Sequence, residues 1–198
     1  MSATSNGYDI VAIGASAGGL QAVCRLVRQL PSDFTIPVAV VQHRARESSA
    51  LAELLQDCTG LHVCEVEDKQ PVEPRHVYVA PPDYHLLVDD GEFALSTEGP
   101  VGYSRPSIDV FFDSVADGYG ATAIGVVLTG ANGDGSRGLV KIVSRGGQAL
   151  VQDPTEAEVA VMPSSAKRAV PRALVLRIDG IAEHLKQLHG LQQASGAT

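Results

Sequence analysis

Ser16 stands in a glycine-rich segment whose pattern is typical of a nucleophilic serine. Residues 14–18 read Gly-Ala-Ser-Ala-Gly, which fits G-x-S-x-G, and they fall between an expected strand and an expected helix. Such a turn needs small neighbours, exposes the hydroxyl and points helix N-terminal N–H groups at a developing oxyanion. The alternative is a loop that binds an anion or a dinucleotide, although Ser16 breaks the G-x-G-x-x-G fingerprint and no Gly-Lys-Ser/Thr follows. The pattern alone leaves both roles open.

A nucleophilic serine needs a general base, and the chain has six histidines. His43 follows the apolar residues 37–41 after one glutamine, so it is expected at the carboxyl end of a strand, where open α/β sheets place their sites. His43 is therefore the predicted base. The remaining histidines are interpreted as surface or packing residues: His62, His76, His85, His184 and His189.

Asp134 is the predicted acid that orients the base. It lies in the small-residue loop 129–135, directly after the most apolar expected strand, and this composition allows close approach of the backbone to another group. The alternative is a turn aspartate that caps the following helix, and Asp109 and Asp153 are weaker rivals for the acid. Ser16, His43 and Asp134 each follow a different expected strand, so they can converge on one edge. Their order along the chain differs from that of α/β-hydrolases, which argues against that fold.

Alternating apolar runs and helical stripes predict the elements that carry these residues. Strands are expected at residues 10–13, 37–41, 61–66, 77–80, 121–128 and 149–151. Helices are expected at residues 20–30, 51–55 (capped by Ser48 or Ser49 and burying Leu51, Leu54 and Leu55), 107–115 and 139–143, with a last one at 181–188. Two β-like runs, 84–88 and 92–95, flank Asp89-Asp90-Gly91 and predict a hairpin. We therefore predict an α/β fold with a doubly wound, mostly parallel sheet, helices on both faces and an antiparallel hairpin.

Composition narrows the class of protein. The 198 residues suit one domain, and the net charge of −8 without a basic patch argues against binding to nucleic acid. No apolar run approaches 18 residues and no signal-peptide pattern is present, so we expect a cytoplasmic protein without membrane insertion. Cys24, Cys58 and Cys64 are odd in number and form no C-x-x-C, so neither a disulfide framework nor a zinc site is expected.

Five motifs in register resemble CheB-type protein-glutamate methylesterases. They stand in the family's order at residues 14–19, 41–43, 105–109, 128–135 and 152–163. The resemblance covers residues 8–190, as a catalytic domain without a receiver domain, and leaves 191–198 as an expected disordered tail. It implies hydrolysis of methyl esters on glutamate side chains of chemoreceptors, deamidation of receptor glutamines, no cofactor and no metal. It also implies a Ser16, His43 and Asp134 triad acting on the methylated cytoplasmic region of a receptor.

The sequence departs from the family's common pattern in three places. Ala131-Asn132 replaces Met-Gly in the acid loop, where the backbone N–H of Ala131 is expected to bind the oxyanion together with that of Ala17. Residues 44–46 (Arg-Ala-Arg) replace a short apolar stretch, and Arg105 is assigned to the substrate side by resemblance. The missing receiver domain predicts constitutive activity or a regulator acting in trans. The rival interpretations are a non-catalytic receptor- or ligand-binding module and a small-molecule esterase or deamidase.

Overall fold

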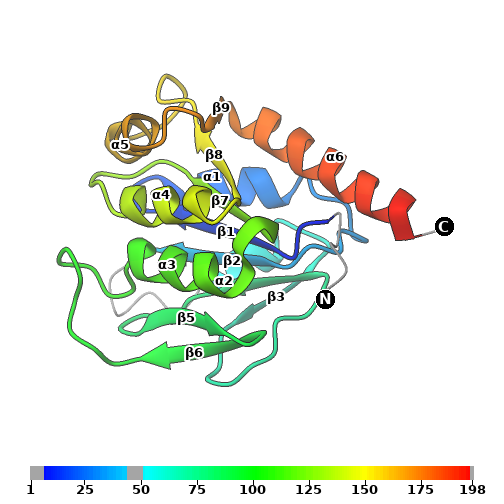
Figure 1. Cartoon of the computed structure of the whole chain (residues 1–198), viewed down its shortest axis with the longest axis horizontal. Helices are drawn as coiled ribbons and strands as arrows, with labels where there is room; N and C mark the ends of the chain where they lie inside the picture. The colour runs from blue at the N-terminus through cyan, green and yellow to red at the C-terminus, as the bar shows by residue number, and fades with distance from the viewer. Residues whose placement is uncertain (1–6, 44–50, 197–198) are drawn as a thin grey trace.

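The protein is a parallel α/β sheet with helices on both faces and a separate hairpin (Figure 1). The structure, a computed structural model, describes residues 7–43 and 51–196. In chain order the elements are β1 (Ile10–Ala15), α1 (Gly19–Val27), β2 (Val38–Gln42), α2 (Leu51–Gln56), β3 (His62–Glu65), β4 (His76–Val79), β5 (His85–Asp89), β6 (Glu92–Ser96), α3 (Ile108–Tyr119), a 3-10 turn (Gly120–Thr122), β7 (Ala123–Val127), α4 (Ser136–Ser144), β8 (Gln148–Gln152), α5 (Val161–Ala169), β9 (Leu174–Leu176) and α6 (Ile178–Gly196).

The order of the strands reverses direction between β1 and β7. The main sheet has the order β3-β4-β2-β1-β7-β8-β9, and each neighbouring pair is parallel. From β1 the chain builds the sheet in one direction through β2, β3 and β4, and it then returns to place β7 on the opposite side of β1. Such a switch point leaves a crevice outside the carboxyl ends of the two strands, where α/β proteins bind their ligands.

Alternate residues of β1 enter two different cores. Val11 and Ile13 pack in the core that contains residues of α1, α2 and α6. Ile10 and Ala12 face the opposite core, formed by α3, α4, α5 and the β5–β6 hairpin. Figure 1 shows the hairpin on the far side of α3 from the sheet's helices α4 and α5. Because β1 is covered on both faces, every one of its residues is buried, which explains the continuous apolar run.

The predicted fold class is confirmed, with differences in individual elements. Helix α5 and strand β9 were not predicted, because α5 has a proline and two serines in its first half and β9 has only three residues. The expectation that Leu54 is buried is wrong: it is 47% exposed, because a helix as short as α2 buries only Leu51 and Leu55. The suggested caps Ser48 and Ser49 lie outside the described residues.

Helix α6 extends into the C-terminal segment. We expected a disordered tail from residue 191, but α6 continues to Gly196. Two causes favour the longer helix. Leu191 and the two glutamines that follow are adequate helix formers, and the Gln192 amide donates to the Tyr8 carbonyl at 2.6 Å. The expected domain boundary at residue 190 therefore falls inside a helix.

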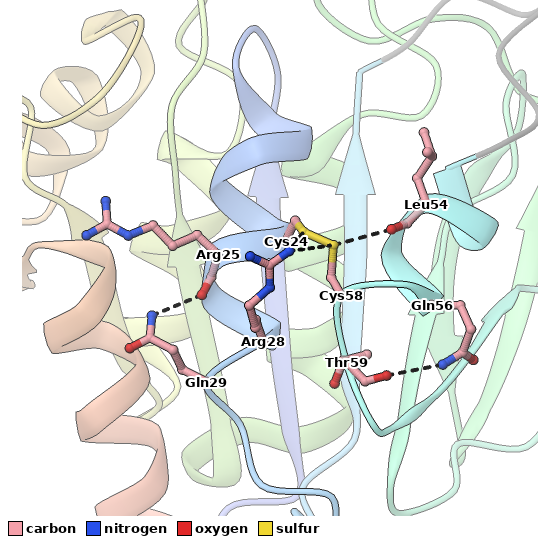
Figure 2. The surroundings of a disulfide bond; sticks show 8 residues. All are labelled: Cys24, Arg25, Arg28, Gln29, Leu54, Gln56, Cys58 and Thr59. Carbon is pink, nitrogen blue, oxygen red and sulfur yellow. Dashed lines mark hydrogen bonds between the residues drawn. A yellow bond between two sulfur atoms is a disulfide. The ribbon is translucent and has the colours of Figure 1, made fainter.

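Cys24 and Cys58 form a disulfide, which corrects the expectation of no such bond (Figure 2). Cys24 lies on α1 and Cys58 follows α2, and their Cα atoms are 5.5 Å apart. The pairing depends on two helices packing on the same face of the sheet, so a spacing of 34 residues gives no local sequence signal. Cys64 is a free cysteine, and burial raises the pKa of its thiol.

Candidate functional site

Ser16 lies at the switch point, on a turn held by the loop that follows β7. Its backbone N–H donates to the Thr129 carbonyl at 2.9 Å, and the Thr129 hydroxyl donates to the Ala17 carbonyl at 2.9 Å. Gly18 has φ +74°, and a Cβ there would overlap the Glu158 side chain, so this turn requires glycine. The chain then enters α1, which places the partly exposed Ser16 at the N-terminal end of that helix. The predicted strand–turn–helix context of the serine is confirmed.

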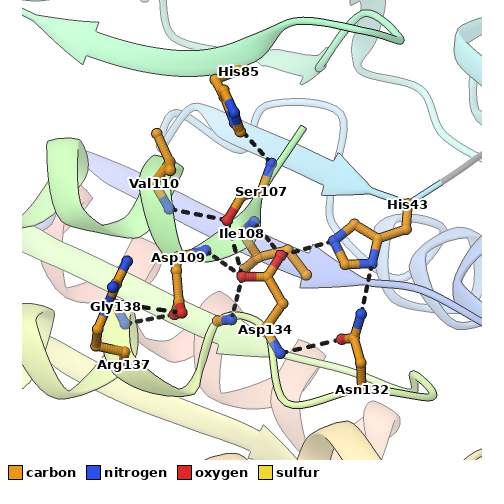
Figure 3. Close-up of polar contacts among 11 residues, drawn as sticks. His43, His85, Ser107, Ile108, Asp109, Val110, Asn132, Asp134, Arg137 and Gly138 are labelled. Atoms are coloured by element: carbon orange, nitrogen blue, oxygen red, sulfur yellow. Dashed lines mark hydrogen bonds and ion pairs between the residues drawn. The ribbon is translucent and has the colours of Figure 1, made fainter. Parts of the chain in front are cut away.

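His43 follows β2 and lies beside the serine turn. Its backbone N–H donates to the Ala15 carbonyl at 3.1 Å, and its ring Nε2 lies 2.8 Å from Asp134 Oδ2 (Figure 3). An ionised carboxylate can only accept a hydrogen bond, so Nε2 carries the ring proton and Nδ1 keeps its lone pair. The structure therefore brings His43 and Asp134 together and leaves Nδ1 as the basic nitrogen.

Asp134 is held at the N-terminus of α3. Its side chain is only 8% exposed, and its carboxylate accepts hydrogen bonds from five donors. These donors are Ser107 Oγ, Asp109 N and Gly135 N on Oδ1, and Ile108 N and His43 Nε2 on Oδ2. The N-terminus of a helix favours a negative charge, so α3 stabilises the ionised form of this acid.

Two opposing effects set the pKa of the Asp134 carboxyl. Burial by itself raises it, but the hydrogen bonds from His43, Asp109 N–H and Ile108 N–H favour the carboxylate more strongly. The net effect is a pKa below the ordinary value of an aspartate. Asp109 differs, because burial raises the pKa of its carboxyl although Gly138 N–H donates to it. Asp134 is thus the better anion of the two.

Ser107, His85 and Asn132 support the pair and were not predicted as site residues. Ser107 caps α3 as expected, but its hydroxyl also donates to Asp134 at 3.0 Å. His85, 1% exposed, accepts from the Ser107 N–H at Nδ1 and faces the Gly99 carbonyl with Nε2. Asn132 contacts His43 and the Asp134 backbone. The only sequence signal was for Ser107, whose cap position placed it at the start of α3.

The predicted oxyanion donors are accessible. Ala17 and Ala131 are both exposed, and within residues 7–43 and 51–196 neither backbone N–H donates a hydrogen bond. Arg105, which the resemblance assigned to the substrate side, takes part in contacts between neighbouring loops. Its guanidinium binds Asp83 Oδ1 and the carbonyls of residues 97 and 98, so it ties together two loops beside the hairpin.

The side chains of the alternative acids and bases bind other partners. Asp153 caps its own turn through Thr155, and Asp109 holds the start of α4 through Gly138. The remaining histidines pack at the rim of the sheet or on α6: His62 and His76 against each other, His184 on Gln148, and His189 on Thr35 and Phe34. Residues 44–46 lie outside the described residues. In the described part of the chain, no cluster of three His, Cys, Asp or Glu side chains could hold a metal ion, and no helix is long and apolar enough to cross a bilayer.

Comparisons with known proteins give one family. A family model described as CheB methylesterase matches residues 11–185. A Leptospira interrogans protein named as a protein-glutamate methylesterase/protein-glutamine glutaminase is 44% identical over 178 residues, 89% of this chain and 92% of that protein. A Myxococcus xanthus protein of the same description is 42% identical over 78% of this chain and 44% of its own length. The crystal structure of the Thermotoga maritima CheB methylesterase catalytic domain matches with a TM-score of 0.87 and 34% identity, covering 92% of this chain and 99% of that one.

Proposed function

Because the chain belongs to the CheB methylesterase family, we propose that it removes methyl esters from glutamate side chains of chemoreceptors, with Ser16, His43 and Asp134 as a catalytic triad. The observation that carries the triad is the 2.8 Å contact between His43 Nε2 and Asp134 Oδ2, which lies beside the serine turn at the switch point of the sheet. This hydrogen bond keeps the ring proton on Nε2, so Nδ1 of His43 has a lone pair that can accept a proton.

The first half of the reaction is acylation of the serine. His43 Nδ1 takes the proton from Ser16 Oγ as Oγ bonds to the ester carbonyl carbon, and the carbonyl oxygen becomes an oxyanion. The imidazolium then protonates the methoxy oxygen, the carbon–oxygen bond to it breaks, and methanol leaves a glutamyl ester on Ser16. Asp134 stays ionised throughout and stabilises the imidazolium.

The second half repeats these steps with water. His43 Nδ1 removes a proton from a water molecule that attacks the glutamyl ester, and Ser16 Oγ leaves with the proton that the imidazolium returns. The products are a free glutamate side chain and the original enzyme. Ammonia in place of methanol as the leaving group gives the second activity, deamidation of a receptor glutamine, by the same steps.

Backbone N–H groups of Ala17 and Ala131 are the proposed oxyanion donors. Both residues are exposed and neither N–H donates a hydrogen bond within the described residues, so a developing oxyanion can bind these groups without breaking existing contacts. Each such donor is worth roughly 3 kcal/mol in acyl transfer. Replacing Met-Gly by Ala131-Asn132 leaves these donors in place, because they belong to the backbone.

The proposed substrate is a protein, because the relatives are named for esterase and glutaminase action on glutamate and glutamine side chains of proteins.

The decisive experiment measures methanol release from methylated chemoreceptor membranes. Wild type should release methanol and Ser16→Ala should not, while both unfold at the same temperature. A fluorophosphonate probe for activated serines distinguishes the failures. Labelling without methanol release indicates an active site with another substrate, and absence of labelling supports a non-catalytic binding module.

A further inference from the structure

Asn132 holds a fixed orientation against the proposed base. Its Oδ1 accepts from the Asp134 N–H at 3.1 Å, and its Nδ2 lies 3.5 Å from His43 Nδ1 (Figure 3). A backbone N–H can only donate, so the amide oxygen must face Asp134 and the amide nitrogen must face His43. An N–H donor therefore points at the lone pair of the nitrogen that is to take the proton from Ser16.

Asn132 and Ser16 compete for this nitrogen. Nδ1 of a neutral imidazole has one lone pair, and within the described residues its hydrogen-bond partner is Asn132 Nδ2 and not Ser16 Oγ. The contact to Asn132 is at the long limit for a hydrogen bond, so replacing it costs little. When a substrate brings the Ser16 hydroxyl onto Nδ1, the Asn132 amide must move away from it. Because the Asp134 N–H still holds Oδ1, the amide N–H of Asn132 can turn only a short way and stays close to the reacting atoms.

We propose that Asn132 is a further catalytic residue, whose side-chain amide rests on His43 Nδ1 in the free protein and donates to the oxyanion during acyl transfer. This inference rests on the proposed serine hydrolase function. The loop that carries Asn132 is tied to the nucleophile, because Thr129 binds the backbones of Ser16 and Ala17. Asn132 also follows Ala131, whose N–H is the neighbouring proposed donor, and its side chain is partly exposed to an incoming substrate.

The exchange of partners is favourable because of charge. A hydrogen bond from an amide to an anionic oxygen is shorter and roughly twice as strong as one between neutral groups. The hydrogen bond from Asn132 therefore becomes stronger when the amide moves from the neutral His43 nitrogen to the oxyanion, and this extra stabilisation exists only in the transition state. An interaction of that kind raises kcat rather than tightening substrate binding.

Two variants remove the donor and one matched variant keeps it. Asn132→Ala removes the whole amide. Asn132→Asp keeps an oxygen for the Asp134 N–H, and so keeps the loop, but lacks the N–H. Gly133→Ala is the control in the same loop, since its Cβ would meet only Ser165 at an ordinary 3.6 Å and Gly133 has no positive φ. The readouts are kcat and KM for methanol release and the rate constant for fluorophosphonate labelling of Ser16.

We expect Asn132→Ala and Asn132→Asp to lower kcat and the labelling rate constant by about 100- to 1,000-fold with little change in KM, whereas Gly133→Ala stays near wild type. The loss should persist at pH 9, where histidines are neutral, and the pH midpoint of Asn132→Ala should match wild type. Recovery of the rate at high pH, a shifted midpoint or a rate within a few-fold of wild type would overturn the proposal, because each indicates that Asn132 acts through His43 or not at all. Labelling tests Asn132 even if receptors release no methanol. A wild type that neither releases methanol nor reacts with the probe overturns both proposals.

Discussion

Replacing Asp134 by asparagine should damage catalysis and stability together. The asparagine has nearly the same shape but has one acceptor oxygen and one NH₂ group in place of two acceptor oxygens. If the oxygen takes the place of Oδ1, it still accepts from Asp109 N–H and Gly135 N–H, and only Ile108 N–H and His43 face the NH₂. The opposite orientation leaves two backbone N–H groups facing a donor, so the first orientation is preferred.

In the preferred orientation, the asparagine lowers both kcat and the free energy of unfolding. His43 must accept from the new NH₂ at Nε2, which moves its proton to Nδ1 and removes the base; loss of the correct tautomer lowers kcat by about 10⁴-fold in such triads. One orphaned buried N–H costs about 1–3 kcal/mol. The lost charge at the start of α3 adds about 0.3–2 kcal/mol. The free energy of unfolding should therefore fall by about 1–5 kcal/mol, which lowers Tm by about 3–20 °C for a chain of this length.

The assay compares Asp134→Asn with Ser16→Ala in methanol release and in thermal unfolding. Both variants should be inactive, but only Asp134→Asn should unfold at a lower temperature, because no described residue accepts a hydrogen bond from the Ser16 hydroxyl. A Tm equal to wild type would show that the contacts at α3 do not stabilise the fold. A kcat within ten-fold of wild type would remove Asp134 from the triad.

Three further predictions concern the disulfide, Arg105 and acid stability. Cys58→Ser opens a covalent loop that spans a separation of 34 residues, so urea unfolding should give a free energy lower by about 4 kcal/mol, while Cys64→Ser serves as the control with a free thiol. Arg105→Ala breaks an ion pair with Asp83 and two bonds to carbonyls, so Tm should fall while KM for receptor substrate stays unchanged; a raised KM at an unchanged Tm would instead place Arg105 on the substrate side. The folded protein lowers the pKa of Asp134, so this group stabilises the fold above the unfolded pKa of about 3.9 and loses that contribution as pH falls through the lowered value. The difference in unfolding free energy between wild type and Asp134→Asn should therefore shrink in that acid range. A difference that does not depend on pH there would contradict the lowered pKa.

The sequence predicts the fold well where one residue pattern determines one element. Strands buried on both faces, such as β1 and β7, are continuous apolar runs that no other element explains as well. Prediction fails where stability comes from distant packing. Strand β9 is three residues long and exists because it pairs with β8, and the Cys24–Cys58 bond exists because α1 and α2 cover the same face.

The same distinction explains which parts of the site were predictable. The placement of Ser16 and His43 at one edge follows from topology, since each comes directly after a parallel strand and such strand ends meet there. The groups that tune them belong to segments far apart in the chain: Asn132 and Asp134 lie about 90 residues beyond the His43 they contact. Whether a side chain accepts or donates at that distance depends on one torsion angle and on the tautomer of its partner, which residue types do not encode. His43 therefore could be predicted as the base, but the choice of Nδ1 as its basic nitrogen required the position of the Asp134 carboxylate.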